Sequence, residues 1–324
     1  MEKRPSSDKK ISRRAFIKAC LAYLALLPFS GGLPGDASAS PAVRNGFNGR
    51  PKRGVKGDYD LVVAKGADPY LITVKAIDKM GGMGKFVARG STVVIKPNIG
   101  WDRTPEQAGN TNPQVVAALI DLAFKAGAKR VNIFDVTCND MRRCYANSGI
   151  EEAARARGAN VYFPDDWDTV NARFDYESPL EDWPVLRDAI ECDTFINVPI
   201  LKHHGLSRLT LSMKNLMGVC GGNRGIIHRD IGRKLVDLTD FINPDLTVID
   251  AYRVLVRNGP TGGNLDDVEL RKTLIAATDP TLADLFAADF AGVDPLSVPN
   301  IKVAVERNFG NADVGKASRA DIEV

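Results

Sequence analysis

The sequence predicts an α/β fold in which a mostly parallel sheet carries helices on both faces, giving α/β/α layers. Short apolar segments of about four to eight residues, the usual length of buried strands, alternate with amphipathic segments of helical length. The apolar segments are continuous and do not alternate with polar residues, which is typical of strands covered on both faces. Strands that alternate with helices in this way favour parallel pairing.

The first predicted strand covers residues 61–64, and Asp68-Pro69 predicts the start of the helix that follows it. An Asp or Asn before a proline is typical of a helix start, because its side chain accepts hydrogen bonds from backbone N–H groups and proline suits the first turn. This helix is expected to run to about Met80. A second buried strand covers residues 93–95, and Asn112-Pro113 repeats the start signal for the next helix.

The same alternation continues toward the C-terminal end of the chain. Pro199 interrupts one of the strands near its end. We predict strands over residues 130–136, 160–163, 194–201, 246–249 and 273–277, and helices over residues 150–157, 206–217, 230–242, 280–290 and 298–309.

Residues 1–39 resemble a twin-arginine export signal, which is an address and not a part of the fold. Arg13-Arg14 and Lys18 precede an apolar run of about a dozen residues, whereas a membrane-spanning helix needs about 20. Pro28 lies inside the run, and Ala37-Ser38-Ala39 offers a cleavage site of small residues. The resemblance implies a periplasmic or other extracytoplasmic location, the twin-arginine translocation machinery as a partner, and folding before export, often with a cofactor already bound.

Without the signal, the chain has no net positive charge, which excludes binding of nucleic acid through overall charge. Residues 1–39 contain seven Lys or Arg and three Asp or Glu, a charge of +4, which leaves −1 for the other 285 residues of a chain whose formal charge is +3. Residues 40–58 are rich in Gly, Pro, Asn and basic residues and predict a linker. Residues 59–324 are expected to form the α/β domain, without a membrane span.

Four cysteines follow the signal: Cys138, Cys144, Cys192 and Cys220. They show neither C-x-x-C spacing nor a ferredoxin-like run, so an iron–sulfur cluster of the chain's own is not expected. A metal or an organic cofactor remains open, and no metal ligand set is assigned. Cys138 and Cys144 suit either a disulfide outside the cytoplasm or two thiols. Cys220 suits either a soft metal ligand or a structural thiol.

Polar side chains follow several predicted strands, at the edge where ligands bind in open parallel sheets. All three histidines of the chain fall between positions 203 and 228, in a window that is also rich in glycine and basic residues. The side chains that we expect to bind a substrate or cofactor are Lys96, Asn98, Lys202, His203, Asn215 and Arg229.

Three further residues of this window, His204, Lys214 and His228, are candidates for catalysis. An imidazole can donate or accept a proton near neutral pH. Because neighbours on an extended segment point to opposite sides, one of His203 and His204 should face the site, and we choose His204 for proton transfer. Lys214 lies in an apolar segment, where burial would lower its pKa and make it a nucleophile or base. A lysine that extends its amine to solvent at the sheet edge explains the same pattern.

Three blocks of the sequence resemble the signature blocks of the domain of unknown function 362 family. The blocks are Val94-Ile95-Lys96-Pro97-Asn98, Phe195-Ile196-Asn197-Val198-Pro199 with Lys202-His203-His204, and Met213-Lys214-Asn215-Leu216-Met217-Gly218. The resemblance covers roughly residues 60–310. It implies a bacterial or archaeal protein of a family in which some members are exported by the twin-arginine route. Other members carry a ferredoxin-like module, whose cysteine runs this chain lacks.

The order and spacing of His204, Lys214 and His228 are also similar to those of the histidines and the cofactor-tethering lysine in nickel-pincer lactate racemases. We expect an exported enzyme or redox accessory protein that binds a small anionic substrate or cofactor at the carboxyl edge of the sheet. The alternative is a non-catalytic periplasmic binding or cofactor-maturation protein that uses the same basic cleft. The sequence does not decide between an enzyme and a binding protein.

Overall fold

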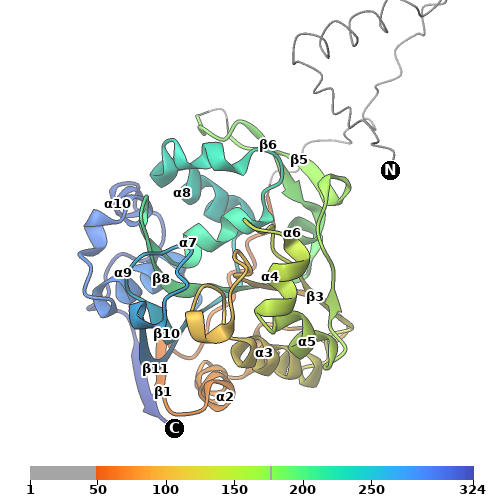
Figure 1. Cartoon of the computed structure of the whole chain (residues 1–324), viewed down its shortest axis with the longest axis vertical. Helices are drawn as coiled ribbons and strands as arrows, with labels where there is room; N and C mark the ends of the chain where they lie inside the picture. The colour runs from red at the N-terminus through yellow and green to blue at the C-terminus, as the bar shows by residue number, and fades with distance from the viewer. Residues whose placement is uncertain (1–48, 176) are drawn as a thin grey trace, which may run out of the picture. The chain divides into compact units, whose positions relative to one another are not determined.

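The computed structural model describes residues 49–175 and 177–324 (Figure 1). The predicted signal peptide, residues 1–39, lies outside the described residues, as do residues 40–48 of the predicted linker. Residues 49–57 form neither helix nor strand. Arg50 makes a buried ion pair of 2.9 Å with Asp245, which immediately precedes a central strand, so this segment is attached to the sheet.

A mostly parallel sheet lies at the centre of the described chain, which confirms the predicted fold class. In spatial order its main path consists of β12 (Arg319–Glu323), β1 (Leu61–Lys65), β11 (Val268–Ala277), β10 (Leu246–Leu255), β7 (Thr194–Val198), β2 (Thr92–Pro97), β3 (Arg130–Ile133) and β4 (Asn160–Val161). On this path β11 runs antiparallel to both neighbours, and the other pairings are parallel. The carboxyl ends of the parallel strands therefore share one edge.

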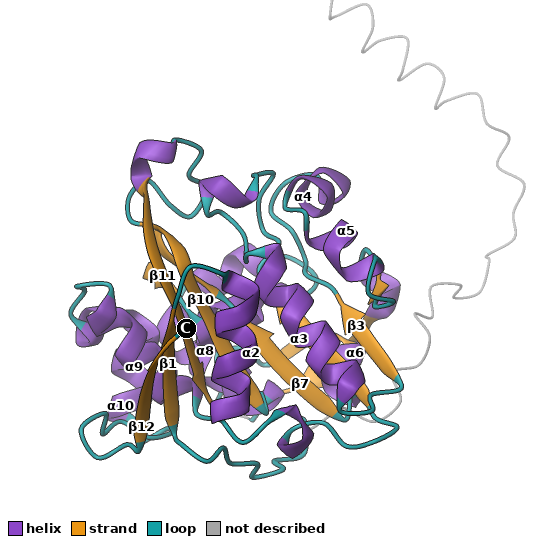
Figure 2. Cartoon of the chain, turned by 90° about the horizontal axis from the view of Figure 1, so that it is seen from below, coloured by secondary structure: helices purple, strands orange, loops and turns teal. Residues whose placement is uncertain are grey.

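Helices cover both faces of this sheet (Figure 2). On one face the core contains side chains of α2 (Pro69–Lys79), α3 (Pro113–Lys125) and α5 (Ile150–Arg155), with α4 (Met141–Asn147) beside α5. On the other face it contains side chains of α6 (Arg187–Glu191), α8 (Ile231–Ile242), α9 (Pro280–Phe290) and α10 (Pro299–Glu306). Val93 and Ile95 pack on the first face and Val94 on the second, because successive side chains of a strand alternate.

The predicted helix starts are confirmed at both proline sites. The Asp68 carboxylate accepts hydrogen bonds from the backbone N–H groups of Tyr70 (2.8 Å) and Leu71 (3.1 Å). The side-chain oxygen of Asn112 accepts one from the N–H of Gln114 at 3.0 Å. Each cap satisfies donors that the first helical turn leaves without a partner, so these starts are fixed by local chemistry.

The prediction of a helix over residues 206–217 is wrong, because much of this segment belongs to a β-hairpin. Pro199 divides the predicted strand 194–201 into β7 and β8 (Ile200–His204), and β8 continues alongside β10. The chain then turns through Arg208, whose φ is +65°, and returns as β9 (Arg208–Thr210), antiparallel to β8. Only Ser212–Asn215 forms an α-helix, α7, followed by the 3₁₀ turn Leu216–Val219.

Several elements were longer than predicted or were not predicted. β10 and β11 each contain ten residues and extend as a hairpin beyond the segments expected from their apolar cores. A separate two-stranded sheet pairs β5 (Thr169–Arg173) with β6 (Asp182–Leu186). The strand β12 pairs with β1 from the far end of the chain. The predicted helices 230–242 and 280–290 are confirmed as α8 and α9.

Candidate functional site

A cavity of about 440 Å³ lies at the carboxyl edge of the sheet, where open parallel sheets bind ligands. Its wall comes from the loops after β2 and β3, from β8, from α7 and from the glycine-rich segment that follows α7. The polar side chains that line it include Asn98, Asp135, Thr137, Cys138, Lys202, His204, Thr210, Lys214, Asn215, Arg224 and His228.

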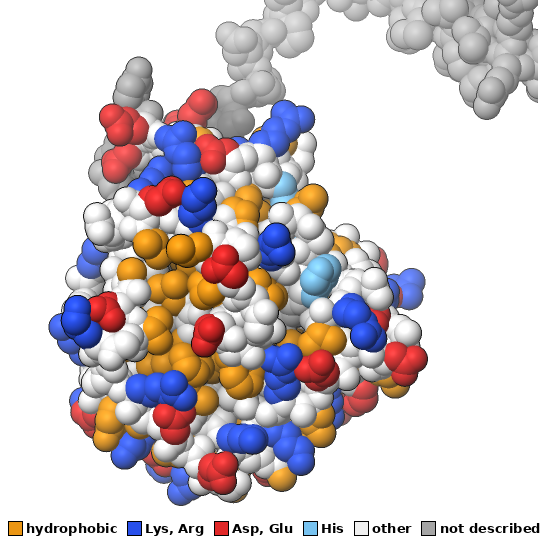
Figure 3. All heavy atoms as spheres, turned by 90° about the vertical axis from the view of Figure 1, so that its left-hand side faces the viewer, with side chains coloured by type: hydrophobic (Ala, Val, Ile, Leu, Met, Phe, Trp, Pro, Cys, Tyr) orange, Lys and Arg blue, Asp and Glu red, His pale blue; other side chains and the backbone are white. Residues whose placement is uncertain are grey.

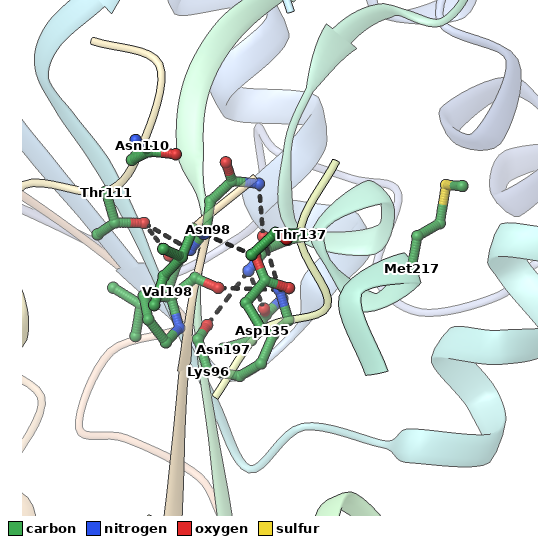
Figure 4. A network of polar contacts seen from close by, with 12 residues as sticks. Lys96, Asn98, Asn110, Thr111, Asp135, Thr137, Asn197, Val198 and Met217 are labelled. Atoms are coloured by element: carbon green, nitrogen blue, oxygen red, sulfur yellow. Dashed lines mark hydrogen bonds and ion pairs between the residues drawn. The ribbon is translucent and has the colours of Figure 1, made fainter. Parts of the chain in front are cut away.

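A buried ion pair lies under the cavity. The ammonium of Lys96 is 2.8 Å from the carboxylate of Asp135, and both side chains are almost fully buried. The same ammonium donates to the Pro97 carbonyl (2.8 Å) and to the side-chain oxygen of Asn215 (3.1 Å). Figure 4 shows Lys96 and Asp135 within this network of polar contacts. Burial lowers the pKa of Lys96, while the Asp135 carboxylate opposes that effect. Since the ion pair joins β2 to the end of β3, it fixes the spacing of two strands that end at the cavity.

Gly218 is required by this ion pair. A Cβ atom at position 218 would lie 1.7 Å from Oδ1 of Asp135 and 2.5 Å from Nζ of Lys96. No side chain fits at that distance, so the 3₁₀ turn can approach the ion pair only with glycine. The spacing of Lys214, Asn215 and Gly218 therefore follows from one local arrangement, in which the turn closes over Lys96.

Amide side chains connect the strands at the cavity floor. Asn98 donates to the side-chain oxygen of Asn215 at 3.0 Å. Asn215 donates in turn to the carbonyl of Lys96 (3.2 Å) and to the side chain of Asn197 (2.8 Å). These bonds satisfy buried polar groups and hold α7 against β2 and β7, which sets the position of Lys214.

Lys202 is a buried lysine whose amine is held by two neutral acceptors. Its Nζ donates to the Gly109 carbonyl (2.6 Å) and to the side-chain oxygen of Asn98 (3.1 Å). Among the described residues no carboxylate forms an ion pair with it. Burial lowers the pKa of Lys202 to about 7, because removing an ammonium from water disfavours its charged form.

Lys214 is also buried, with 8% of the residue exposed, and its amine has weaker partners. Its Nζ lies 3.4 Å from Nε2 of His228 and 3.4 Å from the sulfur of Met217. No ion pair with a carboxylate forms here among the residues that the structure describes. Burial lowers the pKa of Lys214 to about 8, and the nearby cationic side chains of Arg224 and Lys96 act in the same direction.

The hydrogen bonds of His228 and His204 define which ring nitrogen carries the proton. Nδ1 of His228 lies 3.1 Å from the carbonyl oxygen of Gly225, which can only accept, so Nδ1 carries the proton and Nε2 faces Lys214 as an acceptor. Nδ1 of His204 accepts from the N–H groups of Leu206 (3.1 Å) and Ser207 (3.2 Å), so the proton is on Nε2.

The two imidazoles stack with ring centres 5.7 Å apart. Burial lowers the pKa of His204 to about 3, and the neighbouring Lys214 adds to the effect. The imidazole of His204 is therefore neutral at ordinary pH, with an N–H to offer. Figure 3 shows one face of the molecule, on which histidine side chains reach the surface in two places beside hydrophobic and basic areas.

The structure brings most of the predicted site residues together. The predicted residues that line the cavity are Asn98, Lys202, His204, Lys214, Asn215 and His228. Lys96 lies beneath them in the ion pair. His203 does not line the cavity; its Nδ1 accepts from the N–H of Gly259 at 3.1 Å. Arg229 is exposed and also lies outside the cavity.

Two important residues were absent from the predicted set. Asp135 follows β3 at the same edge as Lys96, so its position after a strand was the available signal. Arg224 belongs to the glycine-rich basic window and donates to the Thr137 carbonyl at 2.7 Å and to Cys138 Sγ at 3.3 Å. Sequence spacing alone gives no means of ranking Arg224 above Arg229.

The four cysteines among the described residues are free thiols, with Cys138 exposed and Cys144, Cys192 and Cys220 buried. Burial raises the pKa of Cys220 to about 12, which leaves it protonated. Within residues 49–175 and 177–324, no three His, Cys, Asp or Glu side chains are grouped so as to hold a metal ion. In the same part of the chain, no helix has the length and apolar character needed to cross a membrane.

The fold and the cavity define an α/β protein with a basic pocket at the carboxyl edge of a mostly parallel sheet. The chain belongs to the family described as "Domain of unknown function (DUF362)", whose model matches residues 93–289. It is 29% identical over 234 residues to the thylakoid-associated protein sll1697 of Synechocystis sp. (strain ATCC 27184 / PCC 6803 / Kazusa), with 69% of this chain and 70% of that protein covered.

A comparison with solved structures matches the chain to the lactate racemase apoprotein from Thermoanaerobacterium thermosaccharolyticum. The two chains are 11% identical, with a TM-score of 0.41. The match covers 71% of this chain and 56% of the racemase chain, so this chain spans about half of that structure.

Proposed function

We propose that this protein is an exported enzyme or redox accessory protein that binds a small anionic substrate or cofactor in the cavity at the carboxyl edge of the sheet. The observation that carries the proposal is the pair Lys202 and Lys214. Both amines are buried at one cavity, and neither forms an ion pair with a carboxylate among the described residues. A buried ammonium without a counter-ion is costly, and an anionic ligand would supply that counter-ion.

The balance of charge in the cavity supports the same ligand class. Three cationic side chains line the cavity, those of Lys202, Lys214 and Arg224, and the only carboxylate among the lining residues is Asp135. Asp135 is already paired with Lys96. At a separation of about 4 Å and an effective dielectric constant of about 20, one opposite charge is attracted by about 4 kcal/mol. A carboxylate or phosphate is therefore the ligand that this lining favours.

Proton transfer at the bound ligand is assigned to Lys214 with His228. The pKa of Lys214 is lowered to about 8, so a fraction of its amine is unprotonated near neutral pH. This unprotonated amine would accept a proton from the ligand, and Nε2 of His228 is placed to share it. His204 would donate its Nε2 hydrogen to a ligand oxygen, as a neutral hydrogen-bond donor. This assignment narrows the role of His204 from the general proton transfer expected from sequence, because both of its Nδ1 contacts are donors.

Calorimetric titration of the protein with pyruvate, lactate and inorganic phosphate tests the ligand class, with neutral lactamide as the uncharged control. We expect the anions to bind and lactamide not to bind. The variant Lys202→Met should lose affinity by about 10- to 100-fold, the range expected for one charge-assisted hydrogen bond. Equal binding of lactate and lactamide would contradict the proposal.

Turnover separates the enzyme from the alternative, a non-catalytic periplasmic binding or cofactor-maturation protein. Exchange of the carbon-bound hydrogen of lactate in deuterium oxide, followed by proton NMR, reports proton abstraction directly. Exchange that disappears in Lys214→Met favours the enzyme, and tight binding without exchange favours the binding protein. Metal analysis and mass spectrometry of natively exported protein show whether a stoichiometric cofactor accompanies the chain.

Export by the twin-arginine route belongs to the proposal as well. It rests on Arg13-Arg14 and the short apolar run after them, which lie outside the described residues. Replacement of both arginines by lysine should leave the protein in the cytoplasm, whereas the unaltered chain should be recovered from the periplasm, shortened after Ala39 if the signal is cleaved. Export of the lysine variant at an unchanged level would contradict this part of the proposal.

A further inference from the structure

The two unpaired lysines of the cavity differ in how their amines are held. Lys202 donates to two oxygen acceptors at 2.6 and 3.1 Å, so its ammonium form is anchored by hydrogen bonds. Among the described residues, the partners of the Lys214 amine are a sulfur atom and an imidazole nitrogen, each at 3.4 Å. An amine with such weak partners can turn toward a molecule in the cavity without losing a strong hydrogen bond. Lys214 is therefore the lysine suited to react, and Lys202 the lysine suited to bind.

The two imidazoles can serve complementary functions in a reaction of the Lys214 amine, one as a proton acceptor and the other as a hydrogen-bond donor. Nε2 of His228 carries no proton and lies beside Nζ of Lys214, so it can accept a proton from the amine. Nε2 of His204 carries a proton and has no hydrogen-bond partner among the described residues. Because His204 lines the cavity, it can donate that hydrogen to a carbonyl oxygen of a ligand.

We propose that Lys214 is a nucleophile that forms an imine with a 2-oxo acid, with His228 accepting a proton from the amine and His204 polarising the carbonyl oxygen. The inference rests on the proposed function in one respect, the anionic ligand. A 2-oxo acid carries a carboxylate next to a ketone or aldehyde, which matches an anchored ammonium and a reactive amine in the wall of one small cavity. Burial lowers the pKa of Lys214 to about 8, so a fraction of the amine is unprotonated near neutral pH.

The chemical step is balanced without an oxidant or a reductant. The lone pair of the Lys214 nitrogen forms a bond to the carbonyl carbon, and the electrons of the C=O π bond move to oxygen. His228 takes one proton from the nitrogen and returns it, through water, to the oxygen, which gives a carbinolamine. The hydroxyl then leaves as water together with the remaining proton of that nitrogen, which leaves the C=N bond of the imine. The sum is one ketone and one amine going to one imine and one water.

Trapping with pyruvate and sodium cyanoborohydride, which reduces imines, tests this step on the full-length chain. Peptide mass mapping should then show a modification on Lys214 equal to the mass of pyruvic acid less one oxygen atom. The modification should be absent in Lys214→Met and slower in His228→Ala. The solvent-exposed Lys316, which forms an ion pair with Asp313, serves as an internal control for non-specific labelling.

The outcomes distinguish this inference from the proposed function. Selective labelling of Lys214 supports the imine. Labelling of Lys316 to the same extent, or no labelling of Lys214 while calorimetry shows that pyruvate binds, overturns the imine and leaves anion binding intact. If lactate or phosphate binds and pyruvate does not, the assignment of a 2-oxo acid as the ligand is wrong, and the proposal of anion binding stands. If none of the anions binds, both proposals fail.

Discussion

The amine of Lys214 lies 3.4 Å from Nε2 of His228, on the side of the imidazole that carries no proton because Nδ1 bonds to the backbone carbonyl of Gly225. The lysine is buried, yet its nearest polar partner is neutral and not a carboxylate. A lysine kept only for stability is normally paired with an acid or extends to solvent.

Replacing Lys214 with methionine should abolish activity and weaken binding of an anion, while leaving the protein as stable as before. Methionine has a similar length and removes a buried ammonium that has no counter-ion among the described residues, so the free energy of unfolding should stay the same or rise. Thermal unfolding and calorimetric titration with lactate measure the two effects. The variant Lys316→Met is the control at an exposed position. A clear loss of stability in Lys214→Met would show a structural role instead.

Anion affinity should fall as the pH rises. The pKa of Lys202 is lowered to about 7 and that of Lys214 to about 8. Both amines are protonated at lower pH and lose their charge as the pH passes through these values, so each titrating lysine weakens binding by up to about tenfold per pH unit. Titration with lactate at about pH 6 and about pH 9 measures the difference. An affinity independent of pH would contradict the role of the two lysines.

The substitution Gly218→Ala should both destabilise the protein and disturb the cavity. The added Cβ would lie 1.7 Å from Oδ1 of Asp135, so the 3₁₀ turn must move away from the ion pair. Overpacking of a buried site costs about 1–3 kcal/mol, and more is expected where the contact is to a charged group. Urea unfolding measures the loss. Gly84→Ala is the matched control, because nothing lies within 4 Å of a Cβ at that position.

Asp284 should make stability depend on pH. Its carboxylate accepts from the N–H groups of Ser212 (2.7 Å) and Met213 (3.2 Å), at the start of the helix that carries Lys214. Burial raises the pKa of Asp284 from 3.8 to about 7. A carboxyl group whose pKa is higher in the folded protein than in the unfolded protein stabilises the fold at a pH below the unfolded pKa. That contribution to stability is lost as the pH rises through the folded pKa.

Between about pH 4 and pH 7, the stability of the wild type relative to Asp284→Asn should therefore decrease by up to about 1.4 kcal/mol per pH unit. Chemical unfolding of both proteins across this range measures the difference, and the comparison cancels groups that titrate in both. A constant difference would show that Asp284 is not protonated in the folded protein.

The sequence predicted best where a structure depends on neighbouring residues. The caps at Asp68 and Asn112 depend on side chains two or three residues from the backbone groups they satisfy. The helix predicted over residues 206–217 failed because β9 is held by pairing with β8 and because Arg208 adopts a positive φ, neither of which the apolar pattern encodes. The direction of β11 and the pairing of β12 with β1 depend on contacts far apart in the chain.

Part of the candidate site was predictable from the order of strands along the chain. Ligands bind beyond the carboxyl ends of parallel strands, which meet at one edge of the sheet, and this rule indicated Lys96, Asn98 and Lys202. It could not distinguish His203 from His204 beyond their alternation, and it did not exclude Arg229, which lies on the exposed side of the last turn before α8. The pairing of Lys96 with Asp135 joins two strand ends, so it is the three-dimensional structure that shows which lysine of the described cavity is paired with a carboxylate.

His204 and His228, the stacked pair of imidazoles in the cavity wall, differ in how they exchange protons. His204 is held by two backbone N–H groups and keeps the same neutral form down to a pKa of about 3, so its wall has a constant charge over the whole physiological range. His228 is only half-buried, so a hydrogen ion that it receives from Lys214 can pass on to water. A proton that reaches His228 would therefore leave the cavity at its half-buried ring, whereas His204 would offer the same Nε2 hydrogen to a ligand across the physiological pH range.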